Sequence, residues 1–457
     1  MSVKRIYRRV KINKVCIESL KEIAVLKGEA GTTVGLDVAK HEIVVVIRWG
    51  DGSFERPWSV SNPSEIALLV ELLCLLREMC DGLVIGIEST GTYSEPVRCA
   101  MTQACLEVHR LSGKGVADYK EIFDGVPSQH DGKDAAMIAE LAHFGKGTPW
   151  PYTPLSETEQ AISHQVARLN VFRNQSNQWI GRLEGMLAKH WPELPGLLDL
   201  SRVTLLKICQ HYGSPAQLIC DDDARQQLRV WGGNLLSFDK IDAILESART
   251  SVGLPMGPSE LTWLKEIASE VLHARAEIKL CEKKLQAIAE SHEQMQPYVK
   301  SAGAVTLCTI WATVGDPGKY PSSGAFLKAL GLNLKELSSG KRKGELAISK
   351  RGPSLARKIL FYWALRSVKH PAIKPWYTHF ITVGRSQSGR QEYRKMKALI
   401  ALLRKLCRSL WYAYRHGVPF DYAKVFPGKP LQKRKRTRNR RKPARKAPLP
   451  AECSPSV

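Results

Sequence analysis

Residues 33–48 read Thr-Val-Gly-Leu-Asp-Val-Ala-Lys-His-Glu-Ile-Val-Val-Val-Ile-Arg. This stretch decides the fold of the N-terminal part, because its apolar, β-branched runs and the turn signal at 49–52 indicate a hairpin of two strands. Asp37 stands in the first strand where an apolar residue is expected. A carboxylate in a core strand is costly without a partner, and a metal ion is the usual one. Carboxylates that converge on Asp37 are therefore the first candidates for a functional site.

The segments after this hairpin favour an α/β domain of the ribonuclease-H-like type. Three strands, helix, strand, helix, strand is the order expected of that fold. Its first and fourth strands are neighbours in the sheet, so Asp37 is expected near Glu88, which ends a short buried strand. The expected elements are a strand over 53–60, a helix from Pro63 to the break at 81–82, a strand over 83–88, a helix over about 93–107 and a strand over 108–111.

A further acidic piece, residues 129–140, reads Gln-His-Asp-Gly-Lys-Asp-Ala-Ala-Met-Ile-Ala-Glu. Asp131 and Asp134 are three residues apart, so on a helix both carboxylates share one face near its N-terminus. Each acid also has an ordinary interpretation: Asp131 as an N-cap, Asp134 as a first-turn acid favoured by the helix dipole, and Glu88 as a surface acid at a strand end. The occurrence of all four acids, Asp37 included, within one α/β unit favours a metal site over these ordinary interpretations.

The chain beyond residue 150 has the pattern of a mostly helical protein, so the expected fold class is α/β plus all-α. Two long helices are expected at about 156–189 and 259–294, the second resembling an exposed or coiled-coil helix. Such helices suit dimerisation, a nucleic-acid clamp or a plain spacer. The predicted division is a basic arm at 1–32, the α/β domain at 33–150, a helical or coiled-coil region at 151–296 with a less periodic insert at 195–258, a separate helical domain at 297–425 and a basic tail at 426–457.

The net charge of +24 points to a polyanion as partner, most simply nucleic acid. Ten Lys or Arg and no acid lie between Lys433 and Lys446, in a low-complexity tail expected to stay disordered until it meets nucleic acid. There is no run of about 18 apolar residues and no signal-peptide core, so we expect a soluble intracellular protein without a membrane role. The eleven cysteines form no C-x-x-C pair, which favours free thiols in a reducing compartment.

Two stretches of the C-terminal half could face phosphates. Residues 301–306 begin a helix after a turn of small residues, which lets backbone amides approach a phosphate. The serines of the segment 337–344 are ordinary loop serines on pattern alone, and a hydrolase triad is weakly supported because no histidine lies near them in sequence. Basic residues flank these serines and could form a phosphate-facing surface: Lys341, Arg342, Lys343, Lys350 and Arg351.

Several passages together point to one family. They are Gly35-Leu36-Asp37-Val38-Ala39-Lys40, Ile87-Glu88-Ser89-Thr90-Gly91-Thr92-Tyr93, Asp131-Gly132-Lys133-Asp134-Ala135, the block from Ser338-Ser339-Gly340 to Ser349-Lys350-Arg351-Gly352, and Gly417-Val418-Pro419-Phe420-Asp421. As a set, in this order, they resemble the DEDD/serine transposases of insertion-sequence family 110, relatives of the Piv-type DNA invertases. The resemblance covers about 33–145 and 297–425.

The resemblance implies a RuvC-like N-terminal domain, a coiled-coil middle and a C-terminal transposase domain with a catalytic serine. Carried over residue by residue, Asp37, Glu88, Asp131 and Asp134 would bind Mg²⁺ or Mn²⁺, the hard cations that carboxylates select. The nucleophile would lie in the Ser-Ser-Gly motif. Aligning on the glycine gives Ser339, whereas counting back without a gap from Ser349 gives Ser338, and we take Ser339.

The same resemblance implies a mechanism and partners. Ser339 would attack a DNA phosphate to form a covalent 5′-phosphoserine link, after which strands of donor and target DNA are exchanged. A structured non-coding RNA, the bridge RNA, would guide the choice of DNA, and homodimers would assemble to a tetramer. The expected location is the bacterial or archaeal cytoplasm, in association with the nucleoid.

Departures from the family leave alternatives open. The chain is longer in its basic arm, insert and tail, His130 stands where the family often has Thr, and Lys341 follows the Ser-Ser-Gly motif in place of a small residue. The third departure weakens the assignment of the serine. The main alternative is a metal-dependent nuclease of the Holliday-junction-resolvase type, which forms no covalent intermediate. A nucleic-acid-binding protein with a decayed active site is a second alternative, against which the complete set of acids argues.

Overall fold

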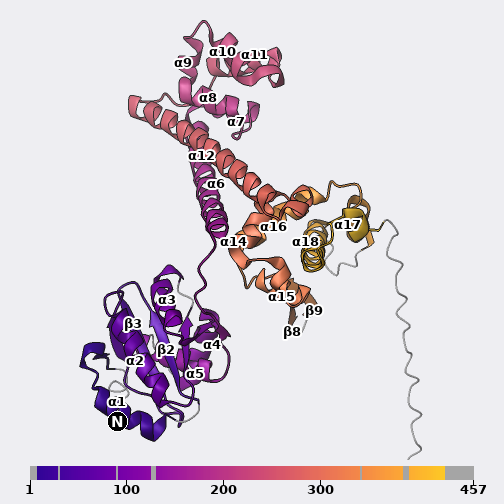
Figure 1. Ribbon diagram of the computed structural model, residues 1–457. Coiled ribbons are helices and arrows are strands. Elements are labelled where there is room, and N and C mark those ends of the chain that lie inside the picture. The colour runs from indigo at the N-terminus through magenta and orange to yellow at the C-terminus, as the bar shows by residue number, and fades with distance from the viewer. Residues whose placement is uncertain are drawn as a thin grey trace, which may run out of the picture. The chain divides into compact units, whose positions relative to one another are not determined.

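The computed structural model describes residues 8–28, 31–88, 91–124, 130–339, 342–383 and 391–427. They belong to two compact units that divide between Pro154 and Leu155, and each unit is described by itself (Figure 1). The basic tail lies outside the described residues. Among the described helices, none is long and apolar enough to cross a lipid bilayer.

The first unit is built on a mixed sheet whose strands follow the order β1-β4-β3-β2-β5-β6-β7. The strand β2 pairs antiparallel with β3 and parallel with β5, which confirms the expected neighbours. The third strand of the prediction is shorter than expected, because residues 53–57 turn back toward β3 before pairing begins at Trp58. The strands are β1 Val10–Lys11, β2 Thr33–Val38, β3 Glu42–Arg48, β4 Trp58–Ser61, β5 Val84–Glu88, β6 Glu107–Leu111 and β7 Thr148–Pro149.

Helices cover both faces of this sheet. The helices α1 (Ile17–Lys27), α2 (Ile66–Met79) and α3 (Glu95–Gln103) share one core with the apolar side chains of β2, β3 and β5. The helix α5 (Asp131–His143) packs on the opposite face, beside α4 (Gly113–Asp124), a helix that the sequence analysis did not predict. Because successive side chains of a strand point to opposite faces, Val34 and Leu36 face the first core, whereas Gly35 and Asp37 face α5.

Glycines let α5 approach the sheet closely. A Cβ on Gly35 would lie 1.9 Å from the carbonyl oxygen of Ala135, and one on Gly86 would lie 3.0 Å from the Ile138 side chain. The Thr33 hydroxyl donates a hydrogen bond to the Ala139 carbonyl at 2.9 Å. Backbone of strand and helix are therefore in direct contact, and the N-terminal turn of α5 is held against the same face as Asp37.

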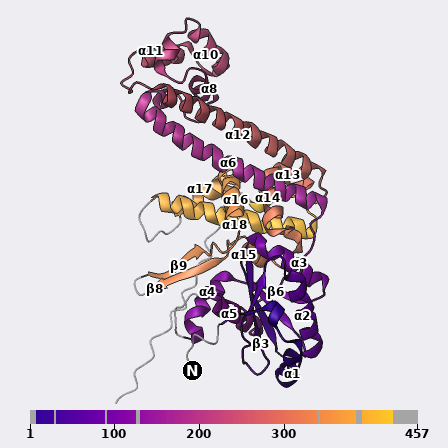
Figure 2. The same cartoon turned by 90° about the vertical axis from the view of Figure 1, so that its left-hand side faces the viewer.

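The second unit begins with two long helices, α6 (Glu157–His190) and α12 (Pro258–Ser291), which confirms the two long helices expected from the sequence. They lie side by side (Figure 2) and exchange ion pairs between Arg168 and Glu277 and between Arg173 and Glu282, at 2.6 and 2.7 Å. The insert between them folds into short helices around an apolar core that it shares with α6 and α12, through Leu187 and Leu264 among others. These are α7 Leu194–Leu197, α8 Val203–His211, α9 Pro215–Ile219, α10 Ala224–Gly232 and α11 Phe238–Arg249.

The C-terminal part of this unit is a helical bundle. Its core continues without a break into the facing sides of α6 and α12, through Ile162, Leu285 and Leu307 among others. Trp363 anchors the bundle by donating its indole N–H to the Ser301 carbonyl at 3.2 Å. The helices are α13 Val299–Ala302, α14 Ala304–Val314, α15 Ser323–Ala329, α16 Ser354–Ser367, α17 Lys374–Val383, α18 Gln391–His416 and α19 Tyr422–Val425.

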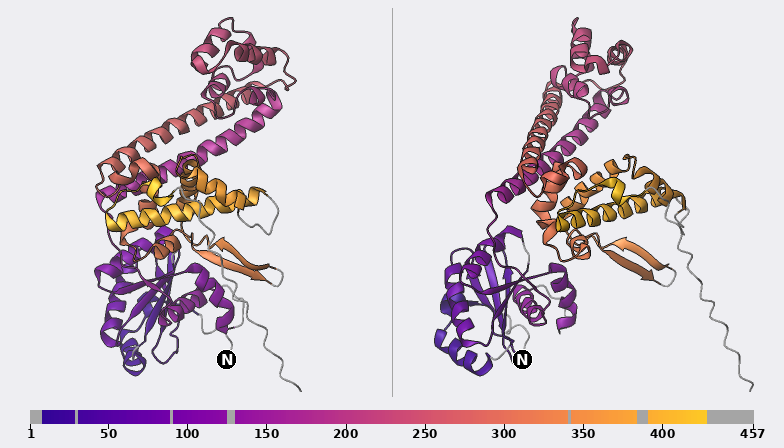
Figure 3. Two further views of the ribbon diagram at one scale, coloured as in Figure 1. Left: turned by 90° about the vertical axis from the view of Figure 1, so that its right-hand side faces the viewer. Right: turned by 45° about the vertical axis from the view of Figure 1, so that its right-hand side comes forward.

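The expectation of a loop at 337–344 is wrong for the residues that the structure describes there. Strands β8 (Leu334–Ser339) and β9 (Arg342–Ile348) pair antiparallel there, and the hairpin extends beyond the helices of its unit in both panels of Figure 3. The strands were not predicted because small and basic residues are frequent in them. Their apolar residues include Leu334, Leu346 and Ile348. The register shifts between Leu337 and Ser339, so the hairpin carries an irregularity at the motif itself.

Candidate active site

Two of the four acids come from neighbouring strands. Gly35 of β2 is paired with Gly86 of β5, and Leu36 with Ile87, so Asp37 and Glu88 are the next pair in the same parallel register. Both follow glycines that face α5, and both side chains are partly buried. The sheet thus brings together the two acids that sequence analysis expected to be neighbours.

The other two acids open α5, as expected. Asp131 and Asp134 both lie in its first turn. The N-cap, however, is His130, whose ring nitrogen accepts a hydrogen bond from the Gly132 amide at 3.0 Å. The interpretation of Asp131 as the N-cap is therefore wrong. Lys133, between the two acids, has a fully buried side chain.

The electrostatics of Asp37 show that the four acids converge. Burial raises the pKa of Asp37 from its usual 3.8 to about 6, with further contributions from the charges of Asp134, Asp131 and Glu88. Burial, followed by the charge of Asp134, also raises the pKa of Glu88. A bound cation would relieve the unfavourable ionisation of Asp37 and Glu88. All the donors are oxygens, which fits Mg²⁺ or Mn²⁺.

Two cations of the chain itself bind the cluster. Lys120 of α4 lies 2.6 Å from the Asp134 carboxylate and lowers the pKa of Asp37 and of Glu88. Arg9 of the basic arm pairs with Asp131 and, at 2.5 Å, with Glu42. Among the described residues, no three or more His, Cys, Asp or Glu side chains stand together in an arrangement that could hold a metal ion. The sequence analysis missed Lys120, because it predicted no helix at 113–124.

A glycine positions Glu88. A Cβ on Gly113, the first residue of α4, would lie 2.3 Å from Glu88 Oε1, so this carboxylate rests directly on the backbone at the start of the helix. The N-terminal end of a helix favours a negative charge. The sequence analysis did not single out Gly113, although a glycine directly after a strand is a usual sign of close backbone approach.

The serine and the basic residues belong to the second unit. Ser338 and Ser339 end β8, and Arg342 and Lys343 begin β9, where the structure describes their backbone alone. Lys341 lies outside the described residues. Lys350 and Arg351 are exposed, and Lys350 adopts a φ of 57°, in a loop held by a short hydrogen bond from the Ser349 hydroxyl to Asn333. The loop therefore presents both cations to solvent on a defined backbone.

Comparisons with known proteins agree with this arrangement. Residues 34–192 match a model of transposases of the DEDD, IS110 type, and residues 298–378 match the model described as the transposase IS116/IS110/IS902 family. The chain is also 29% identical over 370 residues to the transposase for insertion sequence element IS1111A of Coxiella burnetii (strain RSA 493 / Nine Mile phase I), an alignment that covers 79% of this chain and 82% of that protein. With both domain models matched in separate stretches and a relative that aligns across them, the chain is similar to transposases of the IS110 family over most of its length.

Proposed function

We propose that the protein cuts and rejoins DNA, using Asp37, Glu88, Asp131 and Asp134 as a metal-binding acid cluster and Ser339 as the nucleophile. Similarity to transposases supports DNA recombination as the activity. The observation that carries the proposal is the placement of the four acids: Asp37 and Glu88 lie at the ends of the neighbouring strands β2 and β5, and the other two acids lie in the first turn of α5, which packs on the same face of the sheet. The net charge of +24 supports a nucleic-acid substrate.

In this proposal the four acids hold Mg²⁺ or Mn²⁺ on a rigid base of two strands and one helix. A bound ion would polarise the scissile phosphate and stabilise charge on the attacking and leaving oxygens. Asp37 and Glu88 are fixed by the sheet and by Gly113, so they change position little as ligands. Lys120 and Arg9, which pair with Asp134 and Asp131, would offset part of the negative charge of the cluster when fewer metal ions are bound.

The serine step follows from simple chemistry. A free hydroxyl is a weak nucleophile, so Ser339 needs positioning in line with the bond that breaks. Its oxygen forms a bond to the phosphorus, the hydroxyl proton leaves, and the 3′-oxygen departs as a free 3′-hydroxyl. The phosphoserine conserves the energy of the phosphodiester, so the reverse attack by another 3′-hydroxyl rejoins the strand.

We further propose the partners that the family resemblance implies: donor and target DNA, a structured guide RNA, and a homodimer that assembles to a tetramer. Positive charge is abundant, which supports partners recognised through their phosphates. Base pairing with an RNA would then choose the DNA. The long helices α6 and α12 offer surface for assembly.

A denaturing gel tests the proposal. Labelled DNA incubated with Mg²⁺ should give a DNA-linked protein band with wild type and with Ser338→Ala, and none with Ser339→Ala or Asp37→Ala. A band lost with Ser338→Ala and kept with Ser339→Ala would move the nucleophile to Ser338. Free cleaved DNA without a covalent band would replace the proposal by the nuclease alternative. Sequencing of co-purified RNA tests the guide: a discrete structured species is expected, and random RNA fragments would contradict it.

A further inference from the structure

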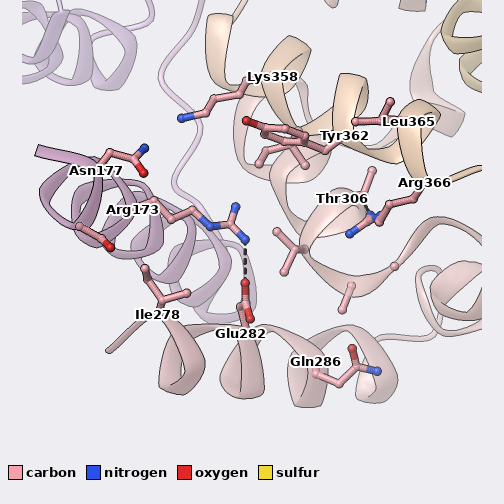
Figure 4. Close-up of a pocket in the computed structure, with 15 residues that line it drawn as sticks. Arg173, Asn177, Ile278, Glu282, Gln286, Thr306, Lys358, Tyr362, Leu365 and Arg366 are labelled. Carbon is pink, nitrogen blue, oxygen red and sulfur yellow. Dashed lines mark hydrogen bonds and ion pairs between the residues drawn. The ribbon is translucent and has the colours of Figure 1, made fainter. Parts of the chain in front are cut away.

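A polar hollow lies at the junction of the two long helices and the C-terminal bundle. It has a volume of about 650 Å³ and is lined by α6, α12, α16 and the first turn of α14. Figure 4 shows side chains of these helices, among them Arg173, Tyr362 and Arg366, around the space. None of the acids or serines of the proposed reaction lines it, so it is a separate feature of the molecule.

The hollow carries an excess of positive charge. Glu282 neutralises Arg173 at 2.7 Å, whereas Lys358 and Arg366 form no ion pair with any acid in the described part of the chain. Arg366 is fixed in place by a hydrogen bond at 3.4 Å to the hydroxyl of Thr306, a fully buried side chain. Two cations without acidic partners at one hollow favour an anionic ligand.

Arg366 also borders a second hollow on its other side. This one has a volume of about 480 Å³ and is again lined by cations, Lys300 and Lys369, together with His370. Arg366 and Gly303 line both hollows. A ligand with regularly repeated negative charges would therefore meet cations in each hollow, with Arg366 between them.

One stripe of α16 combines these charges with an aromatic face. Lys358, Tyr362 and Arg366 follow one another at intervals of four residues, so they lie along one side of the helix. Tyr362 is 47% exposed, and Leu365 beside it is 49% exposed. Asn177 of α6 contributes an amide on the opposite wall. A flat exposed ring, an amide and free cations are together the groups that bind a base and its phosphate.

We propose that this hollow binds one unpaired nucleotide of a nucleic-acid strand, with its phosphate at Arg366 and Lys358 and its base against Tyr362. The inference rests on the proposed nucleic-acid function and adds to it a site outside the chemistry. A paired base in a duplex is already stacked on its neighbours and cannot offer its face to Tyr362. The strand continues along the second hollow, where Lys300 and Lys369 meet the next phosphate.

Binding measurements on the full-length chain test this site. Fluorescence anisotropy would measure the affinity for three labelled nucleic acids of the same sequence: single-stranded DNA, duplex DNA and single-stranded RNA. We expect Tyr362→Ala to weaken single-strand binding about tenfold, with less than about twofold effect on the duplex. Tyr362→Phe keeps the ring and should bind as wild type. Tyr412→Ala, which removes a 54% exposed tyrosine from α18, is the matched control and should have no effect.

The salt dependence gives a second readout. Arg366→Ala and Lys358→Gln should each reduce the slope of log K against log salt by about one, because each removes one phosphate contact. All of the altered side chains are exposed, so the melting temperature should not change. If the substitutions weaken binding of only the single-stranded RNA or only the single-stranded DNA, the bound nucleotide belongs to that kind of strand.

Two results would overturn the site. One is unchanged binding of both single strands by Tyr362→Ala, and the other is an equal loss on the duplex. If the serine-dependent covalent band forms while Tyr362→Ala binds normally, the site fails and the proposed function stands. If the wild type binds no nucleic acid at all, both fail.

Discussion

Glu88 Oε1 lies so close to the backbone of Gly113 that a Cβ at this glycine would be only 2.3 Å from it. Gly113→Ala is therefore expected to displace Glu88 from the acid cluster and to lower DNA cleavage at least tenfold, at a stability cost of about 1–3 kcal/mol from overpacking. Cleavage rate and thermal unfolding measure the two effects. Gly115→Ala, on the same helix, would place its Cβ 3.7 Å from the nearest atom, the Ser112 Cβ, and should leave cleavage unchanged. Equal effects of both substitutions would contradict the positioning role of Gly113.

The raised pKa of Asp37 predicts a pH-dependent stability of the metal-free protein. Its pKa is about 6 in the folded state against 3.8 ordinarily, so between these values the folded state binds more protons than the unfolded state. Stability therefore falls as pH rises from about 4 to above 6. Urea unfolding in EDTA across this range should show the decline, and Asp37→Asn should remove it. A decline of the same size in Asp37→Asn would assign it to another group.

Lys120 should set the pH at which the cluster ionises. Its charge lowers the pKa of Asp37 and of Glu88, so Lys120→Met is expected to move the acidic limb of the cleavage–pH profile toward higher pH while leaving the plateau nearly unchanged. Lys114→Met is the matched control, because Lys114 belongs to the same helix and pairs at 3.2 Å with exposed Asp118. A lowered plateau with an unmoved limb would show that Lys120 contacts the substrate instead.

Glycines of the two units should respond to alanine with opposite signs. In Gly35→Ala the new Cβ would lie 1.9 Å from a backbone oxygen of α5, so we expect a loss of several kcal/mol in the free energy of unfolding, about 3 or more. In Gly185→Ala the Cβ meets nothing within 4 Å on helix α6, so a gain of about 0.5–1 kcal/mol is expected. Chemical denaturation monitored by circular dichroism would measure both. A neutral Gly35→Ala would contradict the direct contact between β2 and α5.

The sequence predicted the acid cluster because local rules govern it. Strand alternation places Asp37 and Glu88 on one face, the parallel neighbours β2 and β5 bring them together, and helical spacing adds Asp131 and Asp134. The contacts of these acids with Lys120, Arg9 and Gly113 depend on tertiary packing between segments far apart in sequence. No periodicity along the chain encodes such contacts.

The C-terminal hairpin and the insert show a different limit. Residues 334–339 and 342–348 pair as strands although small and basic residues outnumber apolar ones there, because cross-strand backbone bonds can form without a strong apolar pattern. The helices of the insert are short, four to twelve residues, so each offers too few turns for a clear helical period. The two helices of 34 residues each gave a pattern long enough to predict.

The two ends of the insert lie next to each other, where α6 ends and α12 begins. The Leu254 amide donates to the Lys189 carbonyl at 3.0 Å, Lys189 pairs with Glu260 at 2.6 Å, and Gly253 rests against the His190 backbone. Between these ends the insert also packs on both long helices, through an apolar core that it shares with them. Because its ends are adjacent, its outer loops can change length without separating α6 from α12, whereas the side chains that it packs on the two helices have to be kept. The outer loops are therefore the places where an engineer can add a short sequence.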